Sequence, residues 1–437
     1  MFRYYLKLSW LSIKRTPMLT LLMVLAIGLG IGVSMTVLTV NHLMGRDPIP
    51  NKSSELFHVQ LYTFDENGGS NSPDEFPYQV TYQDAMNLHL SEIPKRKTRS
   101  LKTGFSVIPE KENMTPFMKS ARAIDSDFFA MFDVQFIHGG VWDKEVDVNG
   151  RNLLVISEPL NDQLFDGQNS VGKELILSGT AFTVVGIIED WQPTPQFYDL
   201  NNGSFGSGEQ MFVPFSLLPI LELPGWGNNN GWKNEIINTY QDKLGSEIFW
   251  NQYWVELPSV LEKQQYQDWL AGYISEQKKL GRFTDKKAAA SLKNVVEWLE
   301  YNSVVSNDSN ILVGLAFMFL AVCMINMLGL LLTKFLRRAP EVGVRRALGA
   351  SRKNIFIQHL VDVGLIGFVG GLVGLGLSQI GLIGVKSLYR NYNNLVEMDL
   401  SLMLTAIMIA LTTGVLAGMY PAWIICRTNP SIYLKVQ

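Results

Sequence analysis

Cysteine is scarce in this chain, and the two that it has, Cys323 and Cys426, both lie in long apolar stretches. The polar stretch Asn41–Asn310 contains no cysteine, so it must fold without disulfide bonds or cysteine-ligated metal. At roughly 270 residues, this stretch is long enough to be stabilised by a hydrophobic core of its own.

The sequence also lacks the motifs of nucleotide and covalent chemistry. It contains no G-x-x-x-x-G-K-[ST] loop for phosphates and no H-E-x-x-H pair for zinc, and its histidines do not cluster. Asp125 and Asp127 are spaced as cation ligands sometimes are, but we interpret them as caps of a helix at Phe128–Met131. The sequence therefore predicts a protein that is not an enzyme and that holds no cofactor or metal of its own.

Charged residues are nearly absent from four windows, and each window reaches the ~20 residues that cross a hydrocarbon core of about 30 Å. We therefore predict an α-helical membrane protein with four transmembrane helices and one large domain between the first two. The predicted order is an amphipathic helix at 1–17, spans at 18–43, 311–333, 355–387 and 400–426, a large domain at 44–310, a short loop at 334–354, a turn at 388–399 and a tail at 427–437.

Lysine and arginine are unevenly distributed among the segments that join these windows. The N-terminal segment, the 334–354 loop and the C-terminal tail are rich in basic residues and hold almost no acid. Because short basic segments stay in the cytoplasm, we predict that both termini and this loop are cytoplasmic and that the large domain lies outside. The large domain is acidic, which argues against a nucleic-acid partner.

Sequence patterns predict a mixed α/β fold for the large domain. Phe57–Phe64 alternates as a strand does, and Thr81–Ile93 has helical periodicity. A hairpin is predicted around Ser178–Gly179, and proline and glycine interrupt Pro193–Gly231. Asp285–Tyr301 is predicted to be a helix that leads into the second span as a stalk.

Glycines recur at i,i+4 spacing in the apolar windows. Small residues at this spacing let helix backbones approach closely in lipid, where the hydrophobic effect does not drive association. We predict helix contacts at Gly28, Gly32, Gly367, Gly370, Gly371, Gly374, Gly414 and Gly418. Polar candidates within the windows are few and include Asn326 and Asp362, which makes the spans a poor channel for a polar solute. We interpret Asp362 as an interfacial group within reach of Arg352 and Lys353.

The stretch EVGVRRALGASRKNIFIQHL, which begins at Glu341, places a basic segment between two spans. We predict one helix over Lys334–Leu348, with Glu341 and Arg345 as an i,i+4 ion pair. Gly349 is the expected helix stop, and Ser351 is the expected N-cap of the next helix. Cytoplasmic retention requires the basic residues but not the stop and the cap, whereas a docking element for a cytoplasmic partner accounts for both.

These residues resemble the E-I-G-[IV]-R-[RK]-A-[LI]-G-A signature of the MacB/FtsX-like ABC permeases. Three further stretches are similar to this family in the same order: YLKLSWLSIKRTPMLTLLMVLAIGLGIGV, VISEPLNDQLFDGQNSVGKELILSGTAFTVVGIIED and GVLAGMYPAWIICRTNPSIYL. The chain departs from the family pattern at Phe165-Asp166-Gly167, at Ser170-Val171-Gly172 and at Tyr433, which lie in expected turns and in the tail.

The resemblance implies a four-span permease of the cell inner membrane that works with a second permease copy, identical or related. Its periplasmic domain is expected to have porter-like halves and an inserted β-rich subdomain near 107–215. A separate cytoplasmic ATPase is expected to bind ATP and Mg, because only a short segment precedes the first window. That ATPase is expected to dock on Glu341, Gly343, Arg345, Arg346, Gly349 and Ser351.

Three functions are compatible with the resemblance. The favoured one is efflux or export of a peptide, an antibiotic or another amphiphile, with a periplasmic adaptor and an outer-membrane channel. A second is the release of lipoproteins, as in Lol-type relatives. The third is an FtsX-like scaffold that activates cell-wall hydrolases, which the large size of the outer domain disfavours.

Overall fold

The computed structural model describes residues 2–66, 75–109, 114–305, 307–388 and 400–427. The chain divides into two compact units, one formed by Met1–Gly45 with Val305–Gln437 and the other by Arg46–Val304. Most of the predicted 388–399 turn and of the tail, including Tyr433, lies outside the described residues.

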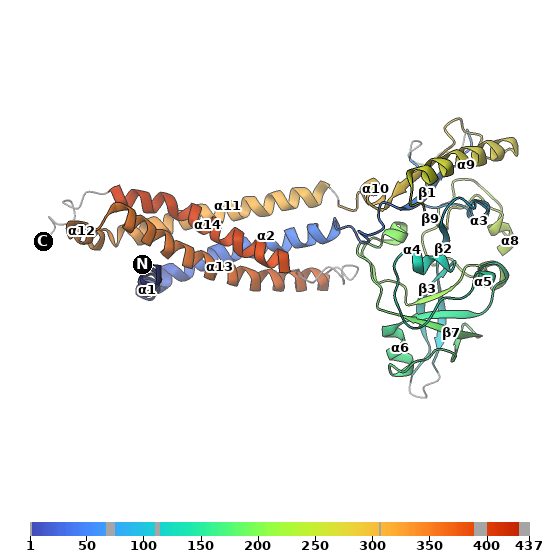
Figure 1. Cartoon of the computed structure of the whole chain (residues 1–437), viewed down its shortest axis with the longest axis horizontal. Coiled ribbons are helices and arrows are strands. Elements are labelled where there is room, and N and C mark those ends of the chain that lie inside the picture. Colours follow the sequence, from blue (N-terminus) through green and yellow to red (C-terminus); the bar gives the residue numbers. More distant parts are fainter. Residues whose placement is uncertain (1, 67–74, 110–113, 306, 389–399, 428–437) are drawn as a thin grey trace. The chain divides into compact units, whose positions relative to one another are not determined.

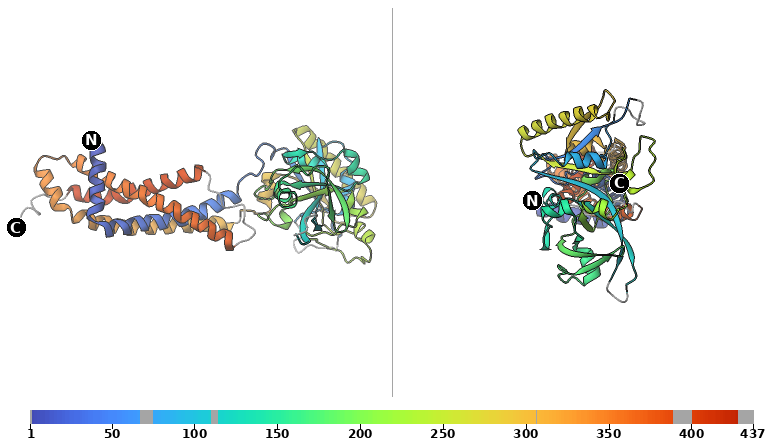
Figure 2. Two further views of the ribbon diagram at one scale, coloured as in Figure 1. Left: turned by 90° about the horizontal axis from the view of Figure 1, so that it is seen from below. Right: turned by 90° about the vertical axis from the view of Figure 1, so that its right-hand side faces the viewer.

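The first unit is a helical bundle. Among the described residues, four of its helices are long and apolar enough to cross a membrane, namely α2, α11, α13 and α14. They run side by side (Figure 1), and α1 crosses their long axes (Figure 2). The helices of this unit are α1 Phe2–Arg15, α2 Pro17–Met44, α11 Asn307–Leu336, α12 Ala339–Ala347, α13 Arg352–Leu388 and α14 Leu400–Arg427.

The single helix predicted over Lys334–Leu348 is wrong. The second span continues as α11 to Leu336, and a new short helix, α12, begins at Ala339. Pro340 lies in the first turn of α12, where its missing N–H leaves no helical hydrogen bond unmade. The proline therefore starts a helix here, and the chain turns at Arg337 and Arg338 instead of continuing straight.

The second unit is built on one ten-stranded mixed sheet with strand order β10-β1-β9-β2-β3-β8-β5-β7-β4, in which β6 pairs with β2 and β7. The β3–β8 and β5–β7 pairs are parallel, and the other described pairs are antiparallel. The strands are β1 Leu56–Tyr62, β2 Arg96–Ile108, β3 Phe117–Ile124, β4 Phe136–Gly139, β5 Leu153–Ser157, β6 Glu174–Leu177, β7 Thr180–Ile188, β8 Met211–Pro214, β9 Gln252–Glu256 and β10 Ala289–Asn294.

Helices cover both ends of this sheet. Helix α9 lies near β1 and β9, whereas α6 lies at the β7 end (Figure 1). A capping box between Ser259 and Glu262 starts α9, whose Tyr266, Leu270 and Ile274 join the core beneath it. The helices of this unit are α3 Tyr82–Leu88, α4 Asp127–Met131, α5 Lys144–Asn149, α6 Glu158–Phe165, the 3-10 helix η1 Phe197–Asn202, α7 Leu217–Ile220, α8 Tyr240–Leu244, α9 Val260–Lys279 and α10 Val295–Tyr301.

The helix predicted over Asp285–Tyr301 is wrong in its first half. Within that half, Ala289–Asn294 forms β10, which pairs antiparallel with β1, because backbone pairing along β1 outweighs the helical propensity of its alanines. Only α10 is helical, and a capping box between Asn294 and Glu297 starts it. Helix α11 begins separately at Asn307, so no continuous helical stalk leads into the second span.

Three further local predictions for the large domain concern a hairpin, a helix and a loop-rich stretch. The hairpin around Ser178–Gly179 is confirmed by antiparallel β6 and β7. Helix α3 occupies only the first part of Thr81–Ile93, and Thr81 caps it. Pro193–Gly231 contains β8, a central strand that the sequence does not reveal because its four residues are too short to show a period. The 107–215 boundaries of an inserted subdomain remain a prediction.

The predicted capping role of Asp125 is wrong. Its carboxylate pairs with Arg99, with 2.6 Å between Arg99 Nη2 and Asp125 Oδ1, and both side chains are buried. Asp127 lies in the first turn of α4 and pairs with Lys144, while Ser126 occupies the N-cap position. A buried guanidinium must have a counter-charge, and that requirement decides where the Asp125 side chain points.

Candidate functional site

Helix α12 presents one face to the bundle and another to the outside. Ala339, Val342 and Gly343 are buried, and their i, i+3, i+4 spacing places them on the inner face. Glu341 is exposed on the outer face, and Leu348, just past the end of the helix, is 83% exposed. The helix is thus fixed on the bundle by small and apolar residues while its outer face stays accessible.

The arginines of α12 tie it to neighbouring helices. Arg345 Nη2 lies 2.6 Å from Glu341 Oε1, and Arg345 Nη1 donates to Gln358 Oε1 of α13 at 3.2 Å. Arg346 Nη1 donates to the carbonyl oxygen of Cys426 in α14 at 3.3 Å. These two side chains therefore anchor α12 to its own bundle, and their predicted contact with a partner remains a prediction.

A sharp turn joins α12 to α13. Gly349 has φ +98, a conformation that L side chains rarely adopt, and its N–H donates to the carbonyl of Arg346. Ser351 Oγ then accepts a hydrogen bond from the N–H of Asn354 at 3.2 Å, within the first turn of α13. The structure thus places Gly349 and Ser351 together in one turn that orients α12.

A buried ion pair lies next to this site and corrects the interfacial interpretation of Asp362. Lys334 and Asp362 are both buried, and Lys334 Nζ lies 3.4 Å from Asp362 Oδ2. Ser12 Oγ donates to the same oxygen at 2.9 Å, and Arg338 donates to the carbonyl of Ser12 at 3.2 Å. Asp362 therefore joins α1, α11 and α13 inside the bundle instead of reaching Arg352 or Lys353.

Two family models match separate parts of the chain. Residues 20–271 match the MacB-like periplasmic core domain, and residues 313–430 match the FtsX-like permease C-terminal domain. The chain belongs to the MacB/FtsX-like ABC permease family. It is accordingly a membrane permease whose large domain is of the periplasmic type.

The permease is similar to longer proteins. It is 22% identical to the macrolide export ATP-binding/permease protein MacB of Syntrophobacter fumaroxidans over 66% of this chain and 43% of the relative. It is 22% identical to MacB of Escherichia coli K12 over 98% of this chain and 60% of the relative. The periplasmic region of MacB from Actinobacillus actinomycetemcomitans aligns over 59% of this chain and 96% of its own, at 12% identity and a TM-score of 0.36. The permease thus spans about half the length of the curated relatives.

The predicted packing glycines of the permease lie at two helix contacts. A Cβ on Gly28 or Gly32 of α2 would meet Val373 or Leu377 of α13 at 2.9 or 2.8 Å. Gly374 lies at this same contact, opposite Ile31. The contact between α13 and α14 contains Gly367, Gly371, Gly414 and Gly418. The glycines therefore lie where backbones approach closely.

Replacing Gly374 by leucine is expected to destabilise the bundle by about 1–3 kcal/mol, because a Cβ there would lie 2.8 Å from Ile31 Cγ2. Gly376→Leu, two residues along α13, is the matched control, since nothing lies within 4 Å of a Cβ there. Heating the solubilised permease with a thiol-reactive dye measures the effect, because Cys323 and Cys426 are buried in the bundle. Equal melting temperatures for the two variants would contradict a packing role for Gly374.

The periplasmic-type domain contains a buried charge cluster that the sequence does not reveal. Arg122 of β3 pairs with Asp199 of η1 and with Glu209, and all three are buried. Tyr198 donates to Glu209 at 2.9 Å, and Gln252 of β9 donates to Asp199 at 2.6 Å. The irregular segment that carries η1 is thereby fixed against β3 and β9.

The pKa values of the two carboxylates in the cluster are shifted in opposite directions. Burial raises the pKa of Asp199 above its ordinary value, and the Arg122 guanidinium only partly offsets this effect. Burial also acts to raise the pKa of Glu209, but Arg122 outweighs it and holds that pKa below its ordinary value. Arg122 is therefore the shared counter-charge of both buried carboxylates.

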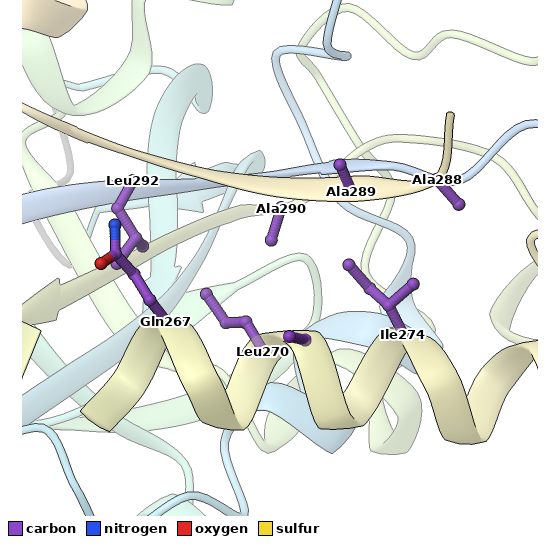
Figure 3. Close-up of a pocket in the computed structure, with 8 residues that line it drawn as sticks. Gln267, Leu270, Ile274, Ala288, Ala289, Ala290 and Leu292 are labelled. Atoms are coloured by element: carbon purple, nitrogen blue, oxygen red, sulfur yellow. The ribbon is translucent and has the colours of Figure 1, made fainter. Parts of the chain in front are cut away.

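A half-open apolar cavity of about 380 Å³ lies between α9 and β10. Figure 3 shows Leu270 and Ile274 of α9 facing Ala290 and Leu292 of β10 across it. Gln267 is the polar side chain among its lining residues. The cavity therefore offers apolar surface and shape, but its lining holds no group for acid–base or nucleophilic chemistry.

Sequence reasoning missed several residues of the α12 region. Val344 and Leu348 read as ordinary apolar residues of a helix, yet both are exposed. Their exposure could not be read from the sequence, because an apolar residue in a short helix ordinarily faces the core. Lys334 and Ser12 gave no signal, because only the packing of α1 against α13 shows that they meet Asp362.

Proposed function

We propose that this chain is the membrane subunit of an ATP-driven exporter and that α12 is the site at which a cytoplasmic ATPase binds. The arrangement of α12 is the observation that carries the proposal. Its inner face and its arginines are held by the bundle, whereas Glu341, Val344 and Leu348 are exposed next to the turn at Gly349. A partner that binds this face would move α11 and α13 directly, because α12 lies between them in the chain.

The proposed orientation follows from charge. Both termini and α12 are assigned to the cytoplasmic side of an inner membrane, and Arg46–Val304 is assigned to the periplasm. The basic residues of the α12 region support this orientation, as does the family's periplasmic core domain.

We further propose that the permease transmits motion and does not form a pore. Helix α11 is about 45 Å long at 1.5 Å per residue. Along the chain, it follows the Arg46–Val304 unit and precedes α12. Two permease copies would bind one ATPase pair and move an amphiphilic cargo such as a peptide or an antibiotic. The macrolide export named for the relatives supports this cargo class, and a periplasmic adaptor and an outer-membrane channel complete the proposal.

Three substitutions on α12 and its turn test the ATPase site. Glu341→Lys, Leu348→Asn and Gly349→Val are expected to lower ATPase co-purification at least tenfold, since losing a contact buried by a partner costs about 2–5 kcal/mol. Gly349→Val acts through the turn, because its φ of +98 strains any β-branched residue. The measurements are membrane insertion, retained ATPase and ATP turnover of the purified complex.

Leu280→Asn is the matched control for Leu348→Asn. Leu280 is 74% exposed but belongs to the other unit, so its replacement should leave ATPase binding unchanged. Normal insertion, native ATPase content and native turnover in all three α12 variants would show that the basic segment only sets topology.

A further inference from the structure

Strand β10 forms one edge of the ten-stranded sheet, and its outer side has no neighbouring strand. The strand order places β10 at the end, where it pairs with β1 alone among the described strands. In an antiparallel pair, every second residue turns its backbone N–H and C=O away from the partner strand. The outer side of β10 therefore offers a row of backbone donors and acceptors to another extended chain.

This edge also lacks the features that commonly protect an edge strand. At the opposite edge, β4 pairs with β7 through a register shift between Phe136 and His138, and such a bulge interrupts regular pairing. Along β10, the pairing with β1 runs from Asn294 to Ala289 without a shift, and the strand contains no proline. Its one charged residue, Lys293, lies near its end. Strand β10 is thus a regular edge to which a further strand can add.

The cavity of about 380 Å³ lies next to this edge, between β10 and α9. Ala288, Ala290 and Leu292 alternate along β10 and point toward α9, where Leu270 and Ile274 face them (Figure 3). The two alanines are too short to fill the space between strand and helix, so part of it stays empty. Ligand pockets have volumes of ~300–1,000 Å³, and this cavity is at the small end of that range, which suits an aliphatic side chain.

The edge and the cavity are complementary to the same kind of ligand. A chain that pairs with β10 lies about 4.8 Å from it and points every second side chain to the face that carries Ala288, Ala290 and Leu292. Its backbone meets the donors and acceptors of the edge, and its apolar side chains meet the cavity. Gln267 adds a polar group at the lining, and no residue that the structure describes hydrogen-bonds to its carboxamide.

We propose that β10 binds an extended peptide as an additional strand, with an aliphatic side chain of the peptide in the cavity between α9 and β10. A second copy of this chain fits less well, because its own β10 would bring alanines that leave the cavity unfilled. A single apolar molecule would fill the cavity but would leave the backbone groups of the edge without partners. The site goes beyond the exporter function proposed above, since peptide binding here requires neither ATP nor an ATPase.

Peptide titration of the full-length permease in lipid nanodiscs tests the site without detergent that could enter the cavity. The probe is a fluorescent synthetic peptide that alternates leucine and threonine, and its anisotropy is expected to rise on binding. Ala290→Leu and Ala271→Leu fill the cavity from β10 and from α9, and each is expected to weaken binding about tenfold, because the leucine of the peptide is then excluded. Ala271 is exposed on α9, so its replacement does not disturb the core.

Ala181→Leu is the matched control for these variants. Ala181 is exposed on β7, away from the cavity lining, so the same substitution there should leave peptide affinity unchanged. Equal affinity of the Ala290→Leu, Ala271→Leu and Ala181→Leu chains would overturn the site. Dimers of the permease that form without peptide and are lost in the Ala290→Leu chain would overturn it too, since they would identify a second copy as the occupant.

Altered peptides separate the contribution of the backbone from that of the side chain. Two N-methylated peptides, one for each set of alternate backbone nitrogens, remove the donors on one side of the peptide at a time, and one of them is expected to bind about tenfold more weakly. Replacing the leucines of the probe by serine should weaken binding by a similar factor. If both N-methylated peptides bind as tightly as the probe, the edge of β10 does not pair with the peptide and the proposal is wrong.

Discussion

Replacing Arg122 by methionine is expected to lower the free energy of unfolding of the Arg46–Val304 unit by about 3–5 kcal/mol. The substitution leaves Asp199 and Glu209 buried without their counter-charge. The midpoint of thermal unfolding should fall on the order of 10 °C. Tryptophan fluorescence of the full-length permease measures it, because Trp191 stacks on Tyr198 beside the cluster with 4.9 Å between ring centroids.

The pH dependence of the stability lost in the Arg122→Met variant identifies the cause of that loss. Without Arg122, the two carboxylates are destabilising when ionised, and protonation relieves them as the pH falls toward about 4. In the native chain, the raised pKa of Asp199 acts in the same direction as in the variant. Glu209 acts in the opposite direction, because its lowered pKa contributes stability that is lost as the pH falls. The difference between variant and native chain should therefore narrow on acidification.

Arg151→Met is the control for this comparison, since Arg151 is exposed. It should change the unfolding midpoint little at any pH. A second variant, with Arg122→Met, Asp199→Asn and Glu209→Gln combined, should recover part of the loss, because it leaves no buried charge unpaired. An Arg122→Met chain as stable as the Arg151→Met chain would show that the cluster contributes nothing.

Breaking the Lys334–Asp362 pair is expected to destabilise the helical unit by a similar amount, about 3–5 kcal/mol for either Lys334→Met or Asp362→Asn. Each single change leaves the other group buried and uncompensated. The two changes combined should cost less than the sum of the two, with a coupling of about 1–3 kcal/mol. Thiol-dye reactivity of Cys323 and Cys426 reports this unit alone, since the other unit has no cysteine.

Lys386→Met supplies the control for the lysine, because Lys386 is exposed near the other end of α13. If the unfolding midpoints of the single variants equal that of the Lys386→Met control, the pair contributes no stability. Additive losses in the double variant would mean that Lys334 and Asp362 act independently. The pair lies at the junction of α1, α11 and α13, one turn before α12, so the same variants also report whether that junction supports ATPase binding.

The sequence by itself determined the organisation of this protein and its family. Four charge-poor windows gave the spans, because crossing a membrane imposes a length and an apolar composition on contiguous residues. The motif that begins at Glu341 identified the family, and the hairpin at Ser178–Gly179 was readable because turn chemistry is local. Glycine spacing likewise marked the faces at which helices approach each other.

Only the tertiary structure decided which buried charged groups meet. Arg122 is far in sequence from Asp199 and Glu209, and Ser12 is far from Asp362, so no local pattern links them. It also made a strand of β10, whose alanines favour a helix, because β1 supplied hydrogen-bonding partners along the sheet. Burial leaves polar groups dependent on partners that folding brings from elsewhere in the chain, and those partners are fixed by packing, not by sequence neighbours.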